Sequence, residues 1–302
     1  MAATTARNET GTRAFGSERF KEALVGYSFI AVPMLVYAVL FFYPIVYAIY
    51  ISRYDWGVLG KIGDEGAGNY RELLHDDRLR IAIKNGLKFT LAFTVCTMAL
   101  GLFVAVVVNS AVRARGFFRS AYYFPSIASS AAIVAIALFI LSADGLFNKL
   151  TGLNRAWFGE SGTALWAIVG LNSWTTSGTV MLFYLASLQS IPPDVYEAAA
   201  IDGSTPWRTF WKITFPLLKP GHFFVLVISI IGCLKVFDQM YIVSGGTGGP
   251  NYSTLTVVLY MYNTAISDIR WGYAATMGVA LFAVIFVFTL VQRLLFGRAE
   301  VR

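Results

Sequence analysis

Charged residues are scarce in this chain, at 14% of 302 residues, and cysteine and histidine occur only twice each. A soluble domain carries about 25% charged residues. Two histidines and two separate cysteines offer neither a metal cluster nor a disulfide framework. Cys96 and Cys233 both lie within apolar runs, where a lone thiol usually serves as a packing residue. The composition therefore argues against a soluble domain and against a metal centre.

Two patterns that would indicate chemistry are also missing from the sequence. The phosphate-binding pattern G-x-x-x-x-G-K-[ST] occurs nowhere in the chain. No pair of acidic residues has a spacing that argues for acid–base catalysis. We therefore expect a protein that is not an enzyme and that binds no cofactor of its own.

Apolar residues dominate the remainder, at 57% of the chain with a mean hydropathy of +0.61. A helix needs roughly 20 mostly apolar residues to cross a bilayer. Runs of that length lie at residues 24–51, 87–109, 122–141, 164–188, 223–243 and 273–296. The run at 252–265 is shorter and is predicted to be a re-entrant or partly buried helix.

These runs predict an all-α, polytopic integral membrane protein with six transmembrane helices. The transmembrane domain would span residues 24–296, with an N-terminal tail at 1–23 and a C-terminal tail at 297–302. Taken together, the two tails and the loops at 110–121 and 190–222 hold more basic than acidic residues, whereas the other loops are balanced. Because basic loops stay inside, both termini are predicted to be cytoplasmic. The net charge of +7 then reflects orientation and lipid contact, not nucleic-acid binding.

The cytoplasmic segment at 190–220 is unusually long for a connection between two spans. Its capping and helix-ending residues predict two short helices. Ser190 is a possible N-cap of the first helix, and Gly203 would end that helix in a left-handed conformation. Ser204 or Thr205 can cap the second helix, which Pro216 is expected to end. Such a pair of helices could lie on lipid with its aromatic residues inserted, or it could dock on another protein.

The spacing of this segment resembles the EAA motif of ABC importer permeases, which reads Glu-Ala-Ala, three residues, Gly, nine residues, Ile, one residue, Leu-Pro. Phe215 replaces the usual Leu. Residues Lys235-Val-Phe-Asp-Gln239 and the later glycines up to Pro250 resemble the carbohydrate-uptake subfamily. The resemblance covers about residues 20–300. It assigns to the coupling loop the residues Glu197, Ala198, Ala199, Asp202, Gly203, Ile213 and Pro216.

The resemblance implies an importer permease of type I with a cytoplasmic coupling helix, in a bacterial or archaeal cytoplasmic (inner) membrane. In that family, the coupling helix docks on a cytoplasmic ABC ATPase dimer, which binds ATP and Mg²⁺. A second permease subunit, usually a different chain, completes the pathway, and an extracytoplasmic solute-binding protein delivers the substrate. The absence of a phosphate loop agrees with this division of labour.

Polar residues within the predicted spans are candidates for the substrate path. The run at 172–177 could form hydrogen bonds between helices or line a cavity. Lys235 and Asp238 lie three residues apart, so they are expected to share a helix face, either as a neutralised pair or as part of the path. The candidates are Asn172, Trp174, Thr176, Tyr184, Lys235, Phe237, Asp238 and Tyr241.

Two alternatives remain within the transport class. The solute could be a glycerophospho-compound or a polyol instead of a sugar. A self-contained secondary transporter would need acidic groups within its spans, and only Asp238 is available. The pair Asp76 and Asp77 is interpreted as solvated surface charge or as a contact for a binding protein. The glycine-rich segment at 245–250 is interpreted as an outward-facing loop.

Overall fold

The computed structural model describes residues 10–110 and 115–296, with side chains described at 21–110 and 115–294. Most of the N-terminal tail and all of the C-terminal tail predicted above lie outside these described side chains. The elements are, in chain order, α1 (Thr10–Tyr37), η1 (Ala38–Phe42), α2 (Tyr43–Ile51), β1 (Tyr54–Gly57), β2 (Gly60–Asp64), α3 (Gly68–His75), α4 (Asp77–Asn109), α5 (Arg115–Ile127), α6 (Ser130–Ile140), α7 (Leu146–Thr151), α8 (Ala164–Gln189), α9 (Pro193–Ile201), α10 (Pro206–Thr209), η2 (Phe210–Thr214), α11 (Phe215–Leu217), α12 (Lys219–Leu234), α13 (Asp238–Ser244), η3 (Pro250–Tyr252), α14 (Val257–Ile266) and α15 (Trp271–Phe296).

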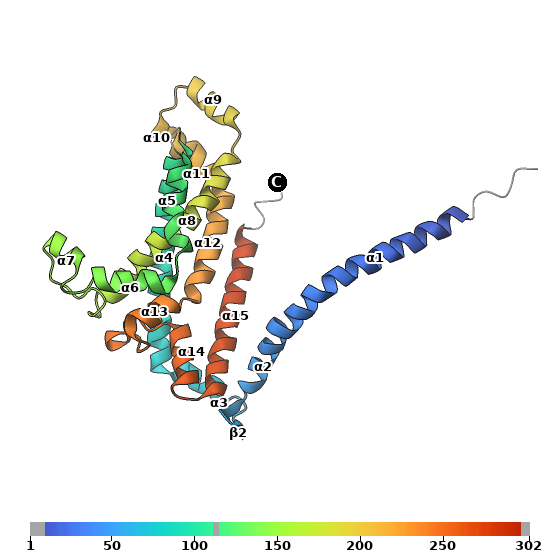
Figure 1. Ribbon diagram of the computed structural model, residues 1–302, viewed down its shortest axis with the longest axis vertical. Helices are drawn as coiled ribbons and strands as arrows, with labels where there is room; N and C mark the ends of the chain where they lie inside the picture. Colours follow the sequence, from blue (N-terminus) through green and yellow to red (C-terminus); the bar gives the residue numbers. More distant parts are fainter. Residues whose placement is uncertain (1–9, 111–114, 297–302) are drawn as a thin grey trace, which may run out of the picture.

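The helices form an elongated bundle with two distinct ends (Figure 1). At one end lies the antiparallel hairpin of β1 and β2 together with α3, and we call this the hairpin end. At the opposite end the segment containing α9 and α10 protrudes beyond the bundle, and we call this the loop end. Between these ends α4 packs against α8, and α5, α12 and α14 pack around this pair.

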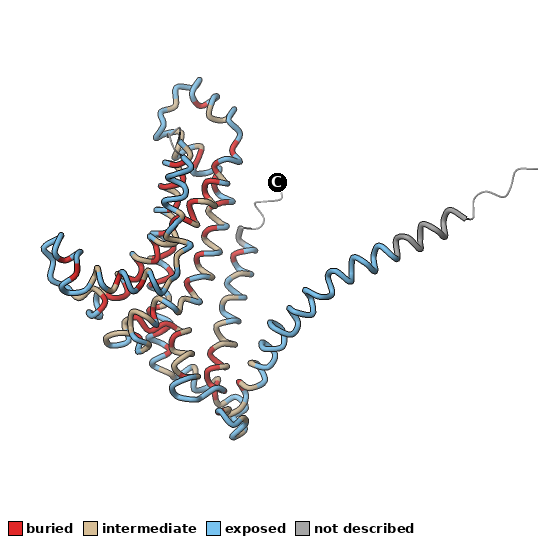
Figure 2. Tube along the Cα trace, viewed as in Figure 1, coloured by how far each residue is buried: buried red, intermediate tan, exposed pale blue. Residues whose placement is uncertain are grey.

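The core between α4 and α8 depends on small residues that let the backbones approach closely. A Cβ at Gly101 of α4 would overlap the side chain of Val180 on α8. A Cβ at Gly178 of α8 would overlap the carbonyl of Tyr122 on α5. Figure 2 shows that the buried residues concentrate along this central group of helices. The apolar outer faces of these helices remain exposed, as expected for helices surrounded by lipid.

Two predicted spans are not continuous helices. The run at 122–141 divides into α5 and α6, which meet at an angle of 93°. The run at 223–243 stops at Leu234 and resumes at Asp238, so a non-helical segment separates α12 from α13. The exposed backbone of this break is partly satisfied, because the hydroxyl of Thr256 donates to the carbonyl of Val236 at 3.2 Å. Backbone of this kind is tolerated at membrane depth only where protein or a cavity surrounds it.

The first predicted span is helical but makes little contact with the bundle. The segment Lys21–Ile51 is apolar and 0% buried, and α1 projects away from the other helices (Figures 1 and 2). A π-helical turn, η1, precedes Pro44, whose ring would otherwise clash with the preceding turn. Only the end of this segment is anchored, since α2 packs against α15.

By length and apolar composition, 3 described helices could each cross a membrane, or up to 5 spans if each bent pair counts as one. The 26-residue α8 is not among them, because its polar run lowers its hydropathy. The helix α14 has 10 residues, too few to span, in agreement with the short helix predicted at 252–265.

Candidate functional site

The protruding segment at the loop end begins with α9, which contains the Glu-Ala-Ala sequence. Pro193 occupies its first turn, where the missing N–H costs nothing. The predicted stop is confirmed: Gly203 has a φ of +68°. The N–H of Ser204 donates to the carbonyl of Ala199 at 3.0 Å, and that of Gly203 to Ala200 at 3.1 Å, which is a Schellman motif. The predicted N-cap was wrong, because the Ser190 hydroxyl donates back to Ser187 within α8.

The second half of this segment starts as predicted and ends later. Thr205 caps α10 by accepting from the N–H of Arg208, and Pro206 follows it. Pro216 does not end the helix, because the chain stays helical to Leu217. The π-helical turn η2 widens the backbone just before Pro216, with the N–H of Phe215 donating to Phe210. This wider turn accommodates the proline ring without a break.

The motif residues divide into an anchored set and an exposed set. Ala199 is buried and Ile213 is half-buried. The hydroxyl of Thr214 donates to that of Tyr196 at 3.3 Å and joins the two helices. The exposed set, which forms the outer surface of the segment, comprises Glu197, Ala198, Asp202, Gly203 and Pro216. The exposed surface of the segment therefore combines the small residues Ala198 and Gly203 with the acidic residues Glu197 and Asp202.

Helices α8 and α12 connect this segment directly to the interior of the bundle. In the parts of these helices that lie nearest the segment, His222 of α12 and Tyr184 of α8 form a hydrogen bond of 2.9 Å. Tyr184 is fully buried, with 0% of its surface exposed. The structure therefore places Tyr184 at a helix–helix contact and not on the lining of the cavity described next.

A cavity of about 360 Å³ lies among α4, α8 and the break between α12 and α13, and we call it the central cavity. Its polar lining includes Asn172 and Thr176 from the run of α8, and Ser229 from α12. Lys235 and Asp238 flank the break, with Phe237 between them. Asn172 and Thr176 of the polar run thus line a cavity, whereas the hydroxyls of Thr175 and Ser177 donate to backbone carbonyls within α8 itself.

The expected helix face shared by Lys235 and Asp238 does not exist, because the helix stops at Leu234 and restarts at Asp238. Within the described part of the chain, these two residues form no ion pair with each other. Both line the central cavity and are exposed to its contents. The neutralised pair is therefore not formed, and the assignment of these charges to the path stays a prediction.

Two other candidates lie apart from the central cavity. Trp174 is 54% exposed and is not part of the lining. Tyr241 lines a separate cavity nearer the hairpin end, between α13 and α14. Its ring contacts Phe237 with centroids 5.3 Å apart, so an aromatic contact lies between the two cavities.

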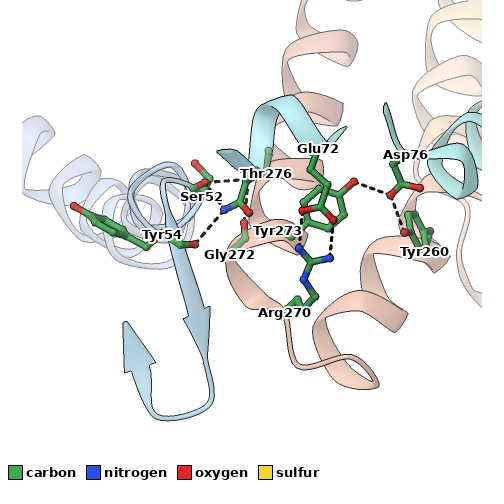
Figure 3. A network of polar contacts seen from close by, with 10 residues as sticks. Ser52, Tyr54, Glu72, Asp76, Tyr260, Arg270, Gly272, Tyr273 and Thr276 are labelled. Atoms are coloured by element: carbon green, nitrogen blue, oxygen red, sulfur yellow. Dashed lines mark hydrogen bonds and ion pairs between the residues drawn. The ribbon is translucent and has the colours of Figure 1, made fainter. Parts of the chain in front are cut away.

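The hairpin end carries a polar network that the sequence did not reveal (Figure 3). Asp76 accepts hydrogen bonds from the hydroxyls of Tyr260 and Tyr273, each 2.7 Å long, and it caps α4 through the N–H of Leu79. Arg270 forms a two-pronged pair with Glu72, at 2.6 and 2.7 Å. We call these five residues, Asp76, Tyr260, Tyr273, Glu72 and Arg270, the outer clamp.

The outer clamp corrects the interpretation of Asp76 as simple surface charge. Burial acts to raise the pKa of Asp76, but the hydrogen bonds from Tyr273, Tyr260 and the backbone outweigh it, so the pKa is lowered. The available signal was an aspartate immediately before a long apolar helix, which is a typical N-cap. Its two tyrosine partners lie almost 200 positions away in sequence, at separations of 184 and 197 residues.

The fold just described is that of an importer permease. It resembles a chain in the crystal structure of a bacterial ABC transporter involved in the import of the acidic polysaccharide alginate, with a TM-score of 0.81 and 22% identity over 93% of this chain and 98% of that one. A second structure, of a bacterial alginate transporter in complex with an alginate pentasaccharide-bound periplasmic protein, matches with a TM-score of 0.80 and 20% identity, covering 91% of this chain and 95% of that one.

The sequence specifies the family. This chain belongs to the binding-protein-dependent transport system inner membrane components, whose family model matches residues 17–301. It is 31% identical to the multiple sugar-binding transport system permease protein MsmF of Streptococcus mutans, over 91% of this chain and 96% of that protein. It is 32% identical to the arabinooligosaccharides transport system permease protein AraP of Bacillus subtilis, over 90% and 88%, and to the lactose transport system permease protein LacF of Rhizobium radiobacter, over 88% and 92%.

Proposed function

We propose that this chain is the transmembrane permease subunit of an ATP-driven, binding-protein-dependent importer that moves a carbohydrate across the cytoplasmic membrane. The observation that carries the proposal is the continuity of α9 with α8 and α12, which join the exposed residues Glu197 and Ala198 to the helices lining the central cavity. The named relatives that transport sugars, oligosaccharides or lactose support the choice of substrate.

The mechanism follows from this continuity. A cytoplasmic ATPase dimer would bind ATP and Mg²⁺ and would also bind the exposed surface of α9. Because the bond between Thr214 and Tyr196 joins its two helices, a push on α9 would be passed to the helices that flank it. Those helices carry Asn172 and Ser229, which both line the central cavity. Closure of the ATPase would therefore change the shape of the cavity.

The central cavity suits a sugar in size and in chemistry. Ligand pockets in proteins usually measure about 300–1,000 Å³, and the central cavity falls within that range. Amide and hydroxyl groups of Asn172, Thr176 and Ser229 can exchange hydrogen bonds with sugar hydroxyls. Phe237 offers an apolar face for the C–H surface of a pyranose ring. A glycerophospho-compound or polyol would use the same groups, with Lys235 facing the phosphate.

The proposal includes partners and an orientation. A second permease subunit would cover the apolar segment Lys21–Ile51, none of whose residues is buried. The loop end and both termini would face the cytoplasm, and the hairpin end would face the solute-binding protein. The six-span domain at 24–296, with tails at 1–23 and 297–302 and the coupling loop at 190–220, remains our division of the chain.

Transport by the reconstituted complex tests the proposal. We expect the chain to co-purify with an ATPase and a second permease, and to import an oligosaccharide in proteoliposomes only with ATP and a loaded binding protein. Asn172→Ala should reduce that import, while Gly170→Ala on the same helix, which touches nothing, should not. Active transport by this chain alone, abolished by Asp238→Asn, would instead establish the secondary transporter and overturn the proposal.

A further inference from the structure

A second cavity, of about 390 Å³, lies near the hairpin end and separate from the central cavity. We call it the tyrosine cavity, because four tyrosines from three segments line it. They stand beside three residues with polar side chains that are drawn from α4, α14 and the turn after α14. The lining groups used below are Tyr241, Tyr252, Tyr260, Tyr262, Arg78, Asn263 and Asp268.

One tyrosine of this cavity is held in an unusual backbone conformation. Tyr252 has a φ of +57°, and its neighbour Asn251 has a φ of +51°. Aromatic residues rarely adopt this region, and such outliers cluster at ligand clamps and active sites. Asn85 of α4 maintains the conformation by donating to the carbonyls of Tyr252 at 2.7 Å and of Leu255 at 3.1 Å. The fold therefore holds Tyr252 in a strained backbone conformation that places its ring at the cavity.

The glycine-rich segment before Tyr252 is shaped around the same cavity. Gly246 has a φ of +84°, and a Cβ there would lie 3.1 Å from the ring of Tyr241. The side chain of Asn263 donates to the carbonyl of Gly246 at 2.8 Å and fastens the segment to α14. The predicted outward-facing loop thus contributes Gly245, Gly246 and Thr247 to the wall of this cavity.

The charged groups of the cavity are available to a ligand. The guanidinium of Arg78 lies 5.5 Å from the centre of the Tyr252 ring. Within the described residues, neither Arg78 nor Asp268 takes part in an ion pair. The ring of Tyr252 is 37% exposed. Apolar ring faces beside unpaired donors and acceptors match a sugar, which has C–H faces and hydroxyl edges.

Aromatic rings in contact with one another lie between the tyrosine cavity and the central cavity. Tyr262 contacts Tyr241 with centroids 5.4 Å apart and Phe237 at 5.0 Å. Phe237 lines the central cavity, whereas both tyrosines line the tyrosine cavity. An aromatic surface is therefore shared between the two cavities.

We propose that the tyrosine cavity binds one sugar unit of an incoming oligosaccharide while the leading unit occupies the central cavity. This inference rests on the proposed function and adds to it a second subsite, which only longer chains can fill. The importer would then favour oligosaccharides over disaccharides at low concentration.

The test compares two substitutions at Tyr252 in the reconstituted importer. Tyr252→Asn removes the ring but keeps a residue that tolerates positive φ, and Tyr252→Phe keeps the ring. The probes are linear gluco-, galacto- and arabino-oligosaccharides of two and five units. We expect Tyr252→Asn to raise the KM for the five-unit chain about threefold to tenfold. The maximal rate and the KM for the two-unit chain should stay unchanged, and Tyr252→Phe should resemble the unsubstituted protein.

The control is Tyr50→Ala, which removes an exposed tyrosine of α2 outside the cavity and should alter neither KM. Equal effects of Tyr252→Asn on both chain lengths, or no effect on either, would overturn the subsite while leaving the proposed function intact. If the unsubstituted importer moved none of these sugars, the proposed function itself would fail and the subsite with it.

Discussion

Individual polar side chains in this protein connect segments that are far apart in the sequence. Asp76 joins the start of α4 to α14 and α15, and Asn85 fastens the strained turn at Tyr252. His222 joins α12 to Tyr184. Polar groups that are embedded in the membrane or partly buried cannot form hydrogen bonds with water. A donor or acceptor left without a partner there would lower the stability of the fold.

Removing the carboxylate of Asp76 should destabilise the hairpin end. Asp76→Ala deletes a helix cap and the acceptor of two hydroxyls, so we expect a loss of about 1–3 kcal/mol in unfolding free energy. The measurement is thermal unfolding of the purified protein in detergent. Asp77→Ala serves as the matched control, because Asp77 forms only an exposed pair with Arg80, and its loss should cost under about 0.5 kcal/mol. Equal losses in the two variants would contradict the clamp.

The contribution of Asp76 should also depend on pH. Its pKa is lowered in the folded protein, so its stabilisation is complete above the ordinary aspartate pKa of about 3.9 and is lost as the pH falls through the lower folded-state pKa. The stability difference between the unsubstituted protein and Asp76→Ala should therefore be constant from about pH 8 to pH 5 and should shrink below about pH 4. Unfolding curves recorded across this range would show it; a difference that grew towards low pH would contradict the assignment.

At the scale of elements, close helix packing and interrupted helices shape the transport path. Gly101 and Gly178 bring α4, α5 and α8 together. The break after Leu234 opens the backbone next to the central cavity. The helices are thus tightly packed where α4, α5 and α8 meet, and they are interrupted next to the central cavity.

Enlarging Gly178 should separate α8 from α5. In Gly178→Leu the side chain would collide with the Tyr122 backbone, and overpacking of this kind costs about 1–3 kcal/mol or more. Gly170→Leu adds the same side chain to the same helix at a site with nothing within 4 Å. We expect lower membrane yield and a lower unfolding temperature for Gly178→Leu alone. Similar behaviour of the two variants would argue against this packing.

The left-handed residue after α9 permits a second prediction at this scale. Gly203→Val would force a β-branched residue into positive φ, at a cost of about 1–2 kcal/mol, whereas Gly203→Asn should be tolerated. Because the segment is exposed, we expect Gly203→Val to lower transport per ATP hydrolysed without lowering the unfolding temperature of the permease. Import and ATPase rates measured on one reconstituted preparation would separate the two effects. If Gly203→Val and Gly203→Asn transported the same amount of solute per ATP hydrolysed, the left-handed turn at Gly203 would not be needed for coupling.

At the scale of the whole molecule, the two ends have different compositions. The loop end presents the exposed residues Glu197, Ala198 and Asp202, and the hairpin end presents the outer clamp and the tyrosine cavity. The long α1 stands apart from both. Such an exposed apolar helix is stable only against lipid or another membrane subunit.

Single cysteines should show that the two ends face opposite sides of the membrane. In a background carrying Cys96→Ser and Cys233→Ser, Leu59→Cys lies on the exposed hairpin and Ile201→Cys on exposed α9. We expect a membrane-impermeant maleimide to label Leu59→Cys in spheroplasts and Ile201→Cys only in inside-out vesicles. Labelling of both from the same side would contradict the predicted topology.

Much of this architecture could be predicted from local sequence. The membrane class followed from apolar runs, and the stop at Gly203 and the cap at Thr205 followed from residues whose backbone preferences act within one turn. The family followed from the spacing of Glu197, Ala198, Ala199 and Gly203. These features depend on neighbours a few positions away, so the sequence by itself determined them.

Other features were decided only by tertiary structure. Apolar composition reports that a segment prefers lipid, but not whether it stays straight, so the bend between α5 and α6 and the break after Leu234 were missed. The burial of Tyr184, the separation of Lys235 from Asp238 and the partners of Asp76 depend on helices distant in sequence. The sequence determined which segments are apolar enough for a membrane; the packing of those segments determined which polar groups line the cavities, because each such group must find its partner across the bundle.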